Sequence, residues 1–263
     1  MMNPTERTIY GVDFSGARLA GEKIWLAQAH IEGETLKIER LLRADELPNS
    51  SLERDLALAA LVRVLGEDAQ AVAGLDFPFS LAQSSIGDQN YADFLNASAD
   101  FSDADAFKAA FTDARRRTDT EGKTPFSPLN YRLYRQTFYG IRDVLRPLAQ
   151  SGAAILPMMD ARPEALWLLE ICPASTLKKE KLYLSYKGKS ELQRDNRATI
   201  TREIKARFGV ETSEAMDERM VADTEGDALD AVLAALGTTR GVRNVASLKP
   251  QDEVDQVEGR VYF

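Results

Sequence analysis

The sequence predicts an α/β fold in which a mixed β-sheet opens with three antiparallel strands, a helix and a fourth strand. Residues 8–14 form a short apolar run that is typical of a buried strand. Residues 23–31 and 35–42 alternate on either side of a Glu-Gly-Glu turn, which indicates a hairpin. Residues 50–66 place leucine and valine at helical spacing between a capping serine and a terminal glycine. A continuous apolar strand over residues 71–77 completes a βββαβ order.

The rest of the chain belongs to the same domain, which we expect to span residues 1–263. No repeat and no linker divides it. Residues 80–165 begin with a long stretch that lacks a clean period, and we expect them to form a largely helical inserted subdomain or lid. The further predicted elements are a helix over residues 130–149, strands over 153–157 and 165–172, and helices over 190–208 and 225–237.

The composition is that of an ordinary globular protein. The 263 residues are 44% hydrophobic and 28% charged, with a net charge of −8. The polar N-terminus does not resemble a signal peptide, and no apolar run reaches the ~20 residues of a membrane helix. We therefore expect a cytoplasmic protein that has no membrane partner.

One cysteine and one histidine exclude several kinds of catalytic site. Cys172 has no second cysteine for an internal disulfide, and with His30 alone it cannot build a zinc cluster. A Ser-His-Asp or Cys-His arrangement would have to use His30, whose alternating surroundings favour an ordinary strand side chain. Carboxylates are the abundant reactive groups that remain, and they favour Mg²⁺ or Mn²⁺.

Two predicted strands end in the same pattern of glycine, aliphatic residue, aspartate and phenylalanine. Because side chains alternate along a strand, Gly11 and Asp13 share one face of the first strand, and Gly74 and Asp76 share one face of the later strand. Each glycine leaves room for another backbone or a ligand beside the carboxylate. Either aspartate alone could bond backbone amides at a strand end. Their repetition favours one shared cation site, since a buried unpaired carboxylate is costly.

Three more acids lie where a metal ligand could stand. Asp230 begins the apolar late helix and has no evident structural role, whereas Asp227 fits a capping box with Thr224. These two aspartates are three residues apart and lie on the same side of the helix. Glu170 ends the apolar run before Pro173, and it is either a further site residue or a paired structural carboxylate.

Four short segments, taken in order, resemble a known superfamily. GVDFSGA, GLDFPFS, LLEICPAS and EGDALDAVLAAL, together with the βββαβ start, resemble the ribonuclease-H-like superfamily and its Holliday-junction-resolvase branch. The chain looks more closely similar to the uncharacterised family of predicted RNase-H-like nucleases. The resemblance implies an α/β, ribonuclease-H-like mixed sheet flanked by helices, with a largely helical insertion.

The same resemblance implies roles for the five acids. Asp13 would be the ligand shared by two metal ions, Asp76 a second ligand and Asp230 the ligand on the late helix. We expect Asp13, Asp76, Glu170 and Asp230 to be catalytic, and Asp13, Asp76, Asp227 and Asp230 to bind Mg²⁺ or Mn²⁺. Two such ions activate water and stabilise both oxygens of an in-line displacement at phosphorus. The expected function is that of a divalent-metal-dependent nuclease, which hydrolyses phosphodiester bonds.

Two segments of the chain are basic although the net charge is negative, and basic segments are typical of proteins that bind nucleic acid. Residues 108–146 carry +5 and residues 178–207 carry +6, which leaves −19 for the rest of the chain. Tyr131, Tyr134 and Tyr139 lie near a stripe of arginines, where they either stack on unpaired bases or pack inward. The side chains expected to bind nucleic acid are Ser15, Arg115, Arg116, Arg117, Lys123, Arg132 and Arg135.

Two other functions remain open from the sequence. The turn at Asp13, Ser15 and Gly16 partly fits the phosphate-binding turn of sugar kinases and actin-like ATPases, which share this fold. Those proteins need two such lobes and a second glycine-rich motif, which is not visible in the sequence. An ATP-dependent phosphotransferase or ATPase is therefore one alternative, and a non-catalytic adaptor on the same fold is the other.

Overall fold

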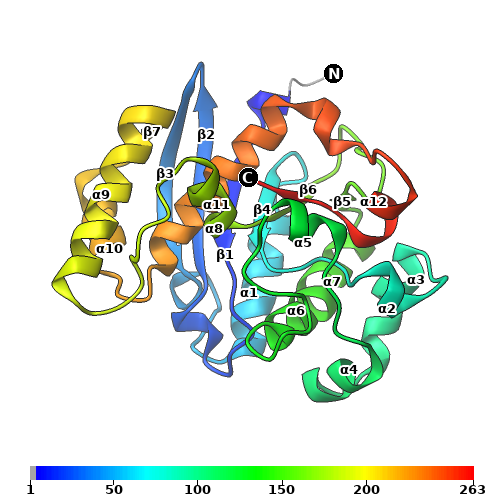
Figure 1. Ribbon diagram of the computed structural model, residues 1–263. Coiled ribbons are helices and arrows are strands. Elements are labelled where there is room, and N and C mark those ends of the chain that lie inside the picture. The colour runs from blue at the N-terminus through cyan, green and yellow to red at the C-terminus, as the bar shows by residue number, and fades with distance from the viewer. Residues whose placement is uncertain (1–3) are drawn as a thin grey trace.

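One mixed sheet contains every strand of residues 4–263, which are the residues described in the computed structural model. The strand order across the sheet is β5, β6, β4, β1, β2, β3 and β7, and β8 also pairs with β6. Helices cover both faces of this sheet (Figure 1). The strands are β1 (Ile9–Asp13), β2 (Trp25–Glu32), β3 (Thr35–Arg43), β4 (Val72–Asp76), β5 (Ala154–Leu156), β6 (Trp167–Ile171), β7 (Val210–Glu211) and β8 (Val261–Tyr262).

The predicted βββαβ order is confirmed. β1, β2 and β3 pair as antiparallel neighbours, and α1 (Arg54–Gly66) then leads to β4, which lies parallel to β1. Gly33, with a φ of 59°, closes the tight turn between β2 and β3, whereas the parallel return of β4 requires a helical crossover. α1 begins at Arg54 rather than near residue 50, and Leu52 lies ahead of it with 44% of its surface exposed.

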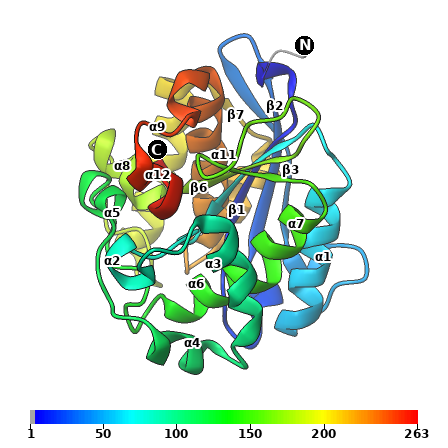
Figure 2. The same cartoon turned by 90° about the vertical axis from the view of Figure 1, so that its right-hand side faces the viewer.

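The two faces of the sheet carry separate hydrophobic clusters. Ile9 and Val72 point to the face that α11 (Asp227–Arg243) covers. Val12 and Leu75 point to the opposite face, where α1, α6 (Tyr134–Gly140) and α7 (Arg146–Gln150) pack. Figure 2 shows α1 and α7 on one side of the strands and α11 on the other. The alternation of side chains along β1 and β4 thus produces three layers, helix, sheet and helix.

Two glycines allow α11 to lie directly on the sheet. A Cβ at Gly11 would come within 2.2 Å of the Ala231 oxygen and the Ala235 nitrogen of α11. A Cβ at Gly74 would lie 1.9 Å from Oγ1 of Thr238, also in α11. The expectation that the glycine admits another backbone is confirmed for Gly11, which the late helix approaches, whereas the neighbour of Gly74 is a side chain of that helix.

Residues 80–165 are largely helical, and parts of this segment pack into the core of the protein. Their last strand, β5, pairs with β6 in the main sheet. α6 (Tyr134–Gly140), a π-helical turn at Ile141–Leu145 and α7 (Arg146–Gln150) follow one another and share the hydrophobic cluster of α1. Pro147 has no amide proton to donate, which accounts for the irregular turn. The remaining helices of the segment are α2 (Gln83–Ile86), α3 (Tyr91–Ala97), α4 (Ala104–Ala110) and α5 (Arg117–Glu121).

The last third of the chain adds short elements that sequence periodicity does not reveal. β8 runs parallel to β6, with Val261 opposite Glu170, and so places the end of the chain beside the sheet. The helices here are α8 (Pro173–Lys179), α9 (Glu191–Phe208), which confirms the predicted charged helix, α10 (Glu214–Ala222) and α12 (Glu253–Glu258). Short 3-10 helices occur at Pro4–Glu6, Ala20–Glu22, Ala44–Glu46, Ser98–Asp100 and Val245–Leu248. Within residues 4–263 no helix combines the length and the apolar character that a membrane span requires.

Candidate metal centre

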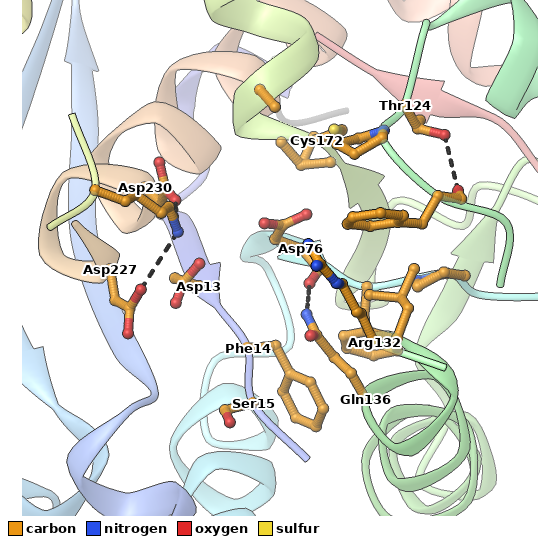
Figure 3. A pocket seen from close by; sticks show the side chains of 18 of the residues that line it. Asp13, Phe14, Ser15, Asp76, Thr124, Arg132, Gln136, Cys172, Asp227 and Asp230 are labelled. Atoms are coloured by element: carbon orange, nitrogen blue, oxygen red, sulfur yellow. Dashed lines mark hydrogen bonds and ion pairs between the residues drawn. The ribbon is translucent and has the colours of Figure 1, made fainter. Parts of the chain in front are cut away.

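The aspartates at the ends of β1 and β4 lie beside each other. The two parallel strands pair in register, with Gly11 opposite Gly74 and Asp13 opposite Asp76. The repeated Gly-x-Asp pattern thus occupies matching positions on neighbouring strands, and both carboxylates stand at the same edge of the sheet (Figure 3). Asp13 is buried, with 7% of its surface exposed. The predicted adjacency of the two aspartates is confirmed.

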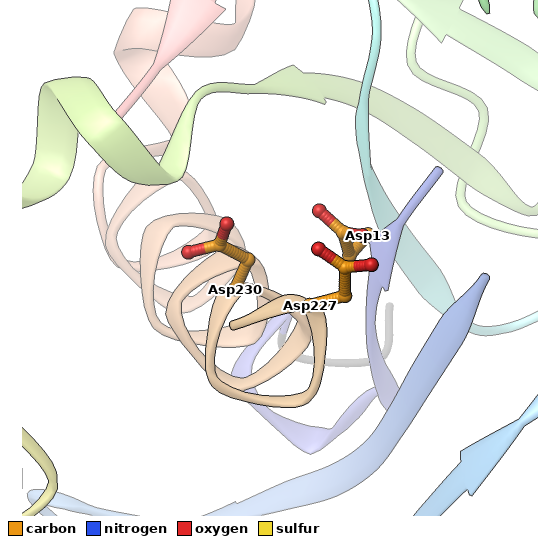
Figure 4. Close-up of side chains that lie close together, drawn as sticks. All are labelled: Asp13, Asp227 and Asp230. Atoms are coloured by element: carbon orange, nitrogen blue, oxygen red, sulfur yellow. The ribbon is translucent and has the colours of Figure 1, made fainter. Parts of the chain in front are cut away.

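α11 brings two more aspartates to this edge of the sheet. One carboxylate oxygen from each of Asp13, Asp227 and Asp230 lies within 4.8 Å of the other two (Figure 4). Asp227 and Asp230 project from the first turn of α11, which begins close to the end of β1. Asp76 lines the same pocket beside them. Three elements that are far apart in the sequence therefore deliver four carboxylates to one place.

The N-terminus of α11 is capped differently from the prediction. Gly226 occupies the N-cap position with a φ of 79°, and the predicted capping box does not form. The carboxylate of Asp223 instead accepts a hydrogen bond from the amide of Ala228 at 2.8 Å. This backbone conformation at the N-cap favours glycine. Asp227 is thereby free of a capping role and faces Asp13.

A lysine and a tyrosine that sequence patterns do not reveal complete the cluster. Nζ of Lys187 lies 2.7 Å from Oδ2 of Asp230 and 3.4 Å from Oδ1 of Asp227. The hydroxyl of Tyr186 donates to the other oxygen of Asp230, Oδ1, at 2.7 Å. Both residues belong to the irregular segment between α8 and α9. One positive charge of the protein itself thus offsets part of the negative charge of the aspartates.

The crowding of carboxylates changes their ionisation. Burial, together with the charges of neighbouring aspartates, holds the pKa of Asp13 and the pKa of Asp76 well above the usual aspartate range. Burial and the charge of Asp230 raise the pKa of Asp227 to about 6, although Lys187 opposes them. Burial disfavours the ammonium of Lys187, but the Asp230 and Asp13 carboxylates outweigh it and hold its pKa well above the usual value. Four carboxylates thus share a single ammonium, and a further cation would relieve the repulsion that raises these pKa values.

Glu170, expected to be catalytic, lies on the other face of the sheet. In the pairing of β4 with β6 it stands opposite Leu75, so its side chain points away from the face of Asp76. Its oxygens accept hydrogen bonds from the guanidinium of Arg116 and from the amide of Phe79. Although Glu170 borders the pocket, both of its oxygens are already used by the protein's own donors. These bonds favour the alternative, a paired structural carboxylate, and a catalytic role for Glu170 stays a prediction.

Two of the three consecutive arginines form ion pairs within the protein. Every guanidinium nitrogen of Arg116 donates within the protein, to Glu170, to Asp119 and to a backbone carbonyl. Arg117 pairs with two aspartates near the end of the chain. Because Arg116 is buried and its donors are engaged, these bonds favour a structural role for it. Arg117 is partly exposed, and its contact with nucleic acid stays a prediction. Arg115 stays exposed, with its guanidinium on backbone carbonyls.

The other residues expected to bind nucleic acid lie in the pocket or at the surface. Ser15 and Arg132 line the pocket (Figure 3). Lys123 is exposed, and Arg135 lies 3.5 Å from Asp105 at the surface. Contact of these four side chains and of Arg115 with nucleic acid stays a prediction.

The tyrosines near the arginine stripe divide into two kinds. Tyr134 and Tyr139 are buried, and the guanidinium of Arg54 lies 3.5 Å from the centre of the Tyr139 ring. Tyr131 is 66% exposed. Of these three tyrosines, therefore, only Tyr131 has a ring surface that is open to an unpaired base.

A pocket of about 710 Å³ opens onto the carboxylates. This volume suits a small ligand or a short segment of a polymer. The four aspartates line one part of it. The positively charged and aromatic residues that also line it include Lys23, Arg132, Lys187, Phe126 and Tyr183.

The single histidine and the single cysteine take no part in the cluster. His30 is a half-buried residue of β2 whose ring nitrogens lie 2.7 and 3.1 Å from oxygens of Glu32 and Glu39. Its interpretation as an ordinary strand side chain is confirmed. Cys172 borders the pocket but is buried, and burial raises the pKa of its thiol to about 12.

The fold and the cluster define a general class, a mixed α/β protein with an acidic centre in a pocket. Comparisons with family models, with curated proteins and with solved structures found no match. The function is therefore inferred from the geometry of the site.

Proposed function

We propose that this protein is a divalent-metal-dependent nuclease built on a ribonuclease-H-like fold. The βββαβ start and the adjacency of β3, β2, β1 and β4 in the sheet support the fold. The observation that carries the function is the meeting of Asp13, Asp76, Asp227 and Asp230 at one edge of the sheet. Carboxylate oxygens without histidine or cysteine suit Mg²⁺ or Mn²⁺.

Two further features fit a divalent cation. The ammonium of Lys187 already lies between Asp227 and Asp230. The carboxylates therefore bind a positive charge of the protein itself. The carboxylates of Asp13 and Asp76 border the pocket, and among residues 4–263 no hydrogen-bond donor reaches their oxygens. These oxygens are therefore available as ligands, whereas Glu170 on the other face is not.

In the proposed reaction a phosphodiester enters the pocket and is hydrolysed beside the aspartates. Asp13, Asp76 and Asp227 would hold the ion, which when bound supplies Lewis acidity toward phosphoryl oxygens and lowers the pKa of water. Lys187 and Arg132 line the same pocket and place positive charge where a phosphate would lie. A carboxylate of the cluster accepts the proton of the attacking water.

The proposal is tested by incubating the purified protein and Mn²⁺ with labelled single-stranded, duplex, hybrid and branched nucleic acids. We expect cleavage of at least one substrate, loss of cleavage in EDTA, and loss of cleavage in Asp13→Asn. Asp88→Asn removes a carboxylate from an exposed loop and serves as the matched control. Cleavage that survives in Asp13→Asn would contradict the proposal, since it would come from a contaminant or another site.

The two alternatives from the sequence make different predictions. A sugar-kinase-like or actin-like protein has two lobes, but every strand of residues 4–263 belongs to one sheet. Gly16 of the phosphate-like turn is also covered, because a Cβ there would lie 2.6 Å from the Arg135 oxygen. These observations favour the nuclease, for which ATP should not raise the melting temperature beyond the effect of metal. A non-catalytic adaptor would give the same response to Mn²⁺ in Asp13→Asn as in the wild type.

A further inference from the structure

The position of Lys187 bears on how many divalent ions the four aspartates can hold. Its Nζ lies 2.7 Å from Oδ2 of Asp230, and the hydroxyl of Tyr186 lies 2.7 Å from Oδ1 of the same carboxylate. Both oxygens of Asp230 are therefore bonded by the protein's own donors. Oδ1 of Asp227 lies 3.4 Å from the same ammonium. The region between Asp227 and Asp230 already contains a cation.

The backbone around Lys187 is held on both sides. The amide of Gly188 donates to the carbonyl of Thr224, just before α11, at 2.6 Å. Arg197 of α9 donates to the carbonyls on either side of Lys187, at 2.6 and 2.9 Å. Gln193, also of α9, donates to the carbonyl of Lys187 itself at 2.6 Å. The backbone that carries Lys187 is thus anchored to two helical regions, and its ammonium is held by its ion pairs with Asp227 and Asp230.

The charges in the site also limit the number of ions. Four aspartates line the pocket together with Lys187. One divalent ion and the ammonium bring three positive charges to four carboxylates. Two divalent ions and the ammonium would bring five, and like charges at such short distances repel strongly in a partly buried site. One divalent ion is therefore the number that the charge of Lys187 favours.

We propose that Lys187 is the second cation of this site, so that the chain binds a single divalent ion beside Asp13, Asp76 and Asp227. The ammonium on Asp230 occupies the place that a second ion would need. Because Lys187 also lines the pocket, it is a positioning residue for the anionic group of a substrate. This inference rests on the proposed metal site and does not depend on the nuclease activity.

The test is the stoichiometry of Mn²⁺ binding without nucleic acid, measured by calorimetry and by electron paramagnetic resonance. We expect one Mn²⁺ per wild-type chain and two per Lys187→Met chain. Lys187→Arg retains the positive charge at this position and should bind one Mn²⁺ per chain. Lys189→Met removes the same charge from an exposed position two residues away and should also bind one. A purely structural ion pair would change the stability of Lys187→Met but not its stoichiometry.

Three outcomes separate this inference from the proposed function. Two ions in the wild type, or one ion in a folded Lys187→Met, would overturn the inference. No binding in the wild type would remove the metal site and both proposals with it. One ion in the wild type and two in Lys187→Met, without cleavage of any substrate, would support Lys187 as the second cation and contradict the nuclease.

A structure of the wild type with Mn²⁺ makes the test independent of how Lys187→Met folds. We expect one anomalous scattering peak beside Asp13 and Asp227, with Lys187 still bonded to Asp230. Two peaks, with the lysine displaced from Asp230, would overturn the inference.

Discussion

Gly11 of β1 lies so close to α11 that a Cβ on this residue would come within 2.2 Å of the backbone nitrogen of Ala235. This contact sets the depth at which α11 rests on the sheet. Asp13 lies two residues further along β1, and Asp227 and Asp230 lie in the first turn of α11. The distance between the carboxylates therefore depends on the absence of a side chain at a glycine outside the site.

Gly11→Ala should destabilise the fold and weaken metal binding together. The added methyl group meets the backbone of the helix, which cannot move aside as a flexible side chain could. We therefore expect the free energy of unfolding to fall by at least about 2 kcal/mol. Gly66→Ala is the matched control, because its nearest neighbour, a side-chain carbon of Leu148, lies 3.7 Å away. Urea unfolding measures both variants. Wild-type stability in Gly11→Ala would show that α11 does not rest on the sheet at this point.

Asp227 should make the metal-free protein less stable as the pH rises. Its pKa is about 6 in the folded protein, against 3.8 for an ordinary aspartate, so the folded state binds more protons between these values. The stability that protonated Asp227 contributes is complete below about pH 4 and is lost as the pH passes through 6. In EDTA, the free energy of unfolding of Asp227→Asn should exceed that of the wild type by a margin that grows to about 3 kcal/mol between pH 4 and 7. Urea unfolding across this range gives the difference, and a difference that is independent of pH would contradict the raised pKa.

Arg116 should matter for stability and not for metal binding. Arg116→Met leaves the buried carboxylates of Glu170 and Asp119 without their cation, which costs about 3–5 kcal/mol. Arg115→Met, at the exposed neighbouring position, should change stability by less than about 0.5 kcal/mol.

A conservative variant separates the structural role of Glu170 from a catalytic one. Glu170→Gln keeps the shape of the side chain, and we expect it to bind Mn²⁺ as tightly as the wild type. Isothermal titration measures this affinity. A large loss of Mn²⁺ affinity in Glu170→Gln would show that Glu170 belongs to the metal site.

Arg132 should contribute one phosphate contact if the pocket accepts nucleic acid. In an Asp13→Asn background, which prevents cleavage, Arg132→Ala should weaken binding and reduce the slope of log affinity against log salt by about 1. Arg202→Ala, on α9 and outside the residues that line this pocket, controls for the loss of net charge. Fluorescence anisotropy at several salt concentrations measures the slopes. Equal slopes for the two variants would show that Arg132 makes no phosphate contact of its own.

The adjacency of Asp13 and Asp76 was predictable because the pattern that indicates it lies within a few residues of each strand. Alternation along each strand places glycine and aspartate on one face, and the same pattern in both strands led to matching positions, Gly11 opposite Gly74 and Asp13 opposite Asp76. Glu170 was not predictable in this way. Its face depends on the register of β6 against β4, and a register that pairs Glu170 with Leu75 turns it away from the site.

Contacts between distant residues explain what the sequence did not reveal. Lys187 lies in an irregular segment, so no period marks it, and its role comes from Asp230 in a helix that follows much later. Arg116 has the pattern of a basic surface run, but its partner Glu170 is 54 residues away. Segments 108–146 and 178–207 carry net positive charge, yet several of these charges are engaged in ion pairs within the protein.

The most direct test of the central claim, that the four aspartates form a divalent-metal site, is calorimetric titration of Mn²⁺ into wild type and Asp13→Asn. The wild type should bind Mn²⁺ and melt at a higher temperature with it, and Asp13→Asn should bind at least about tenfold more weakly. In EDTA the variant should melt above the wild type, because one repelling carboxylate is gone. Asp88→Asn should behave as the wild type. Equal Mn²⁺ affinity in Asp13→Asn and wild type would contradict the claim.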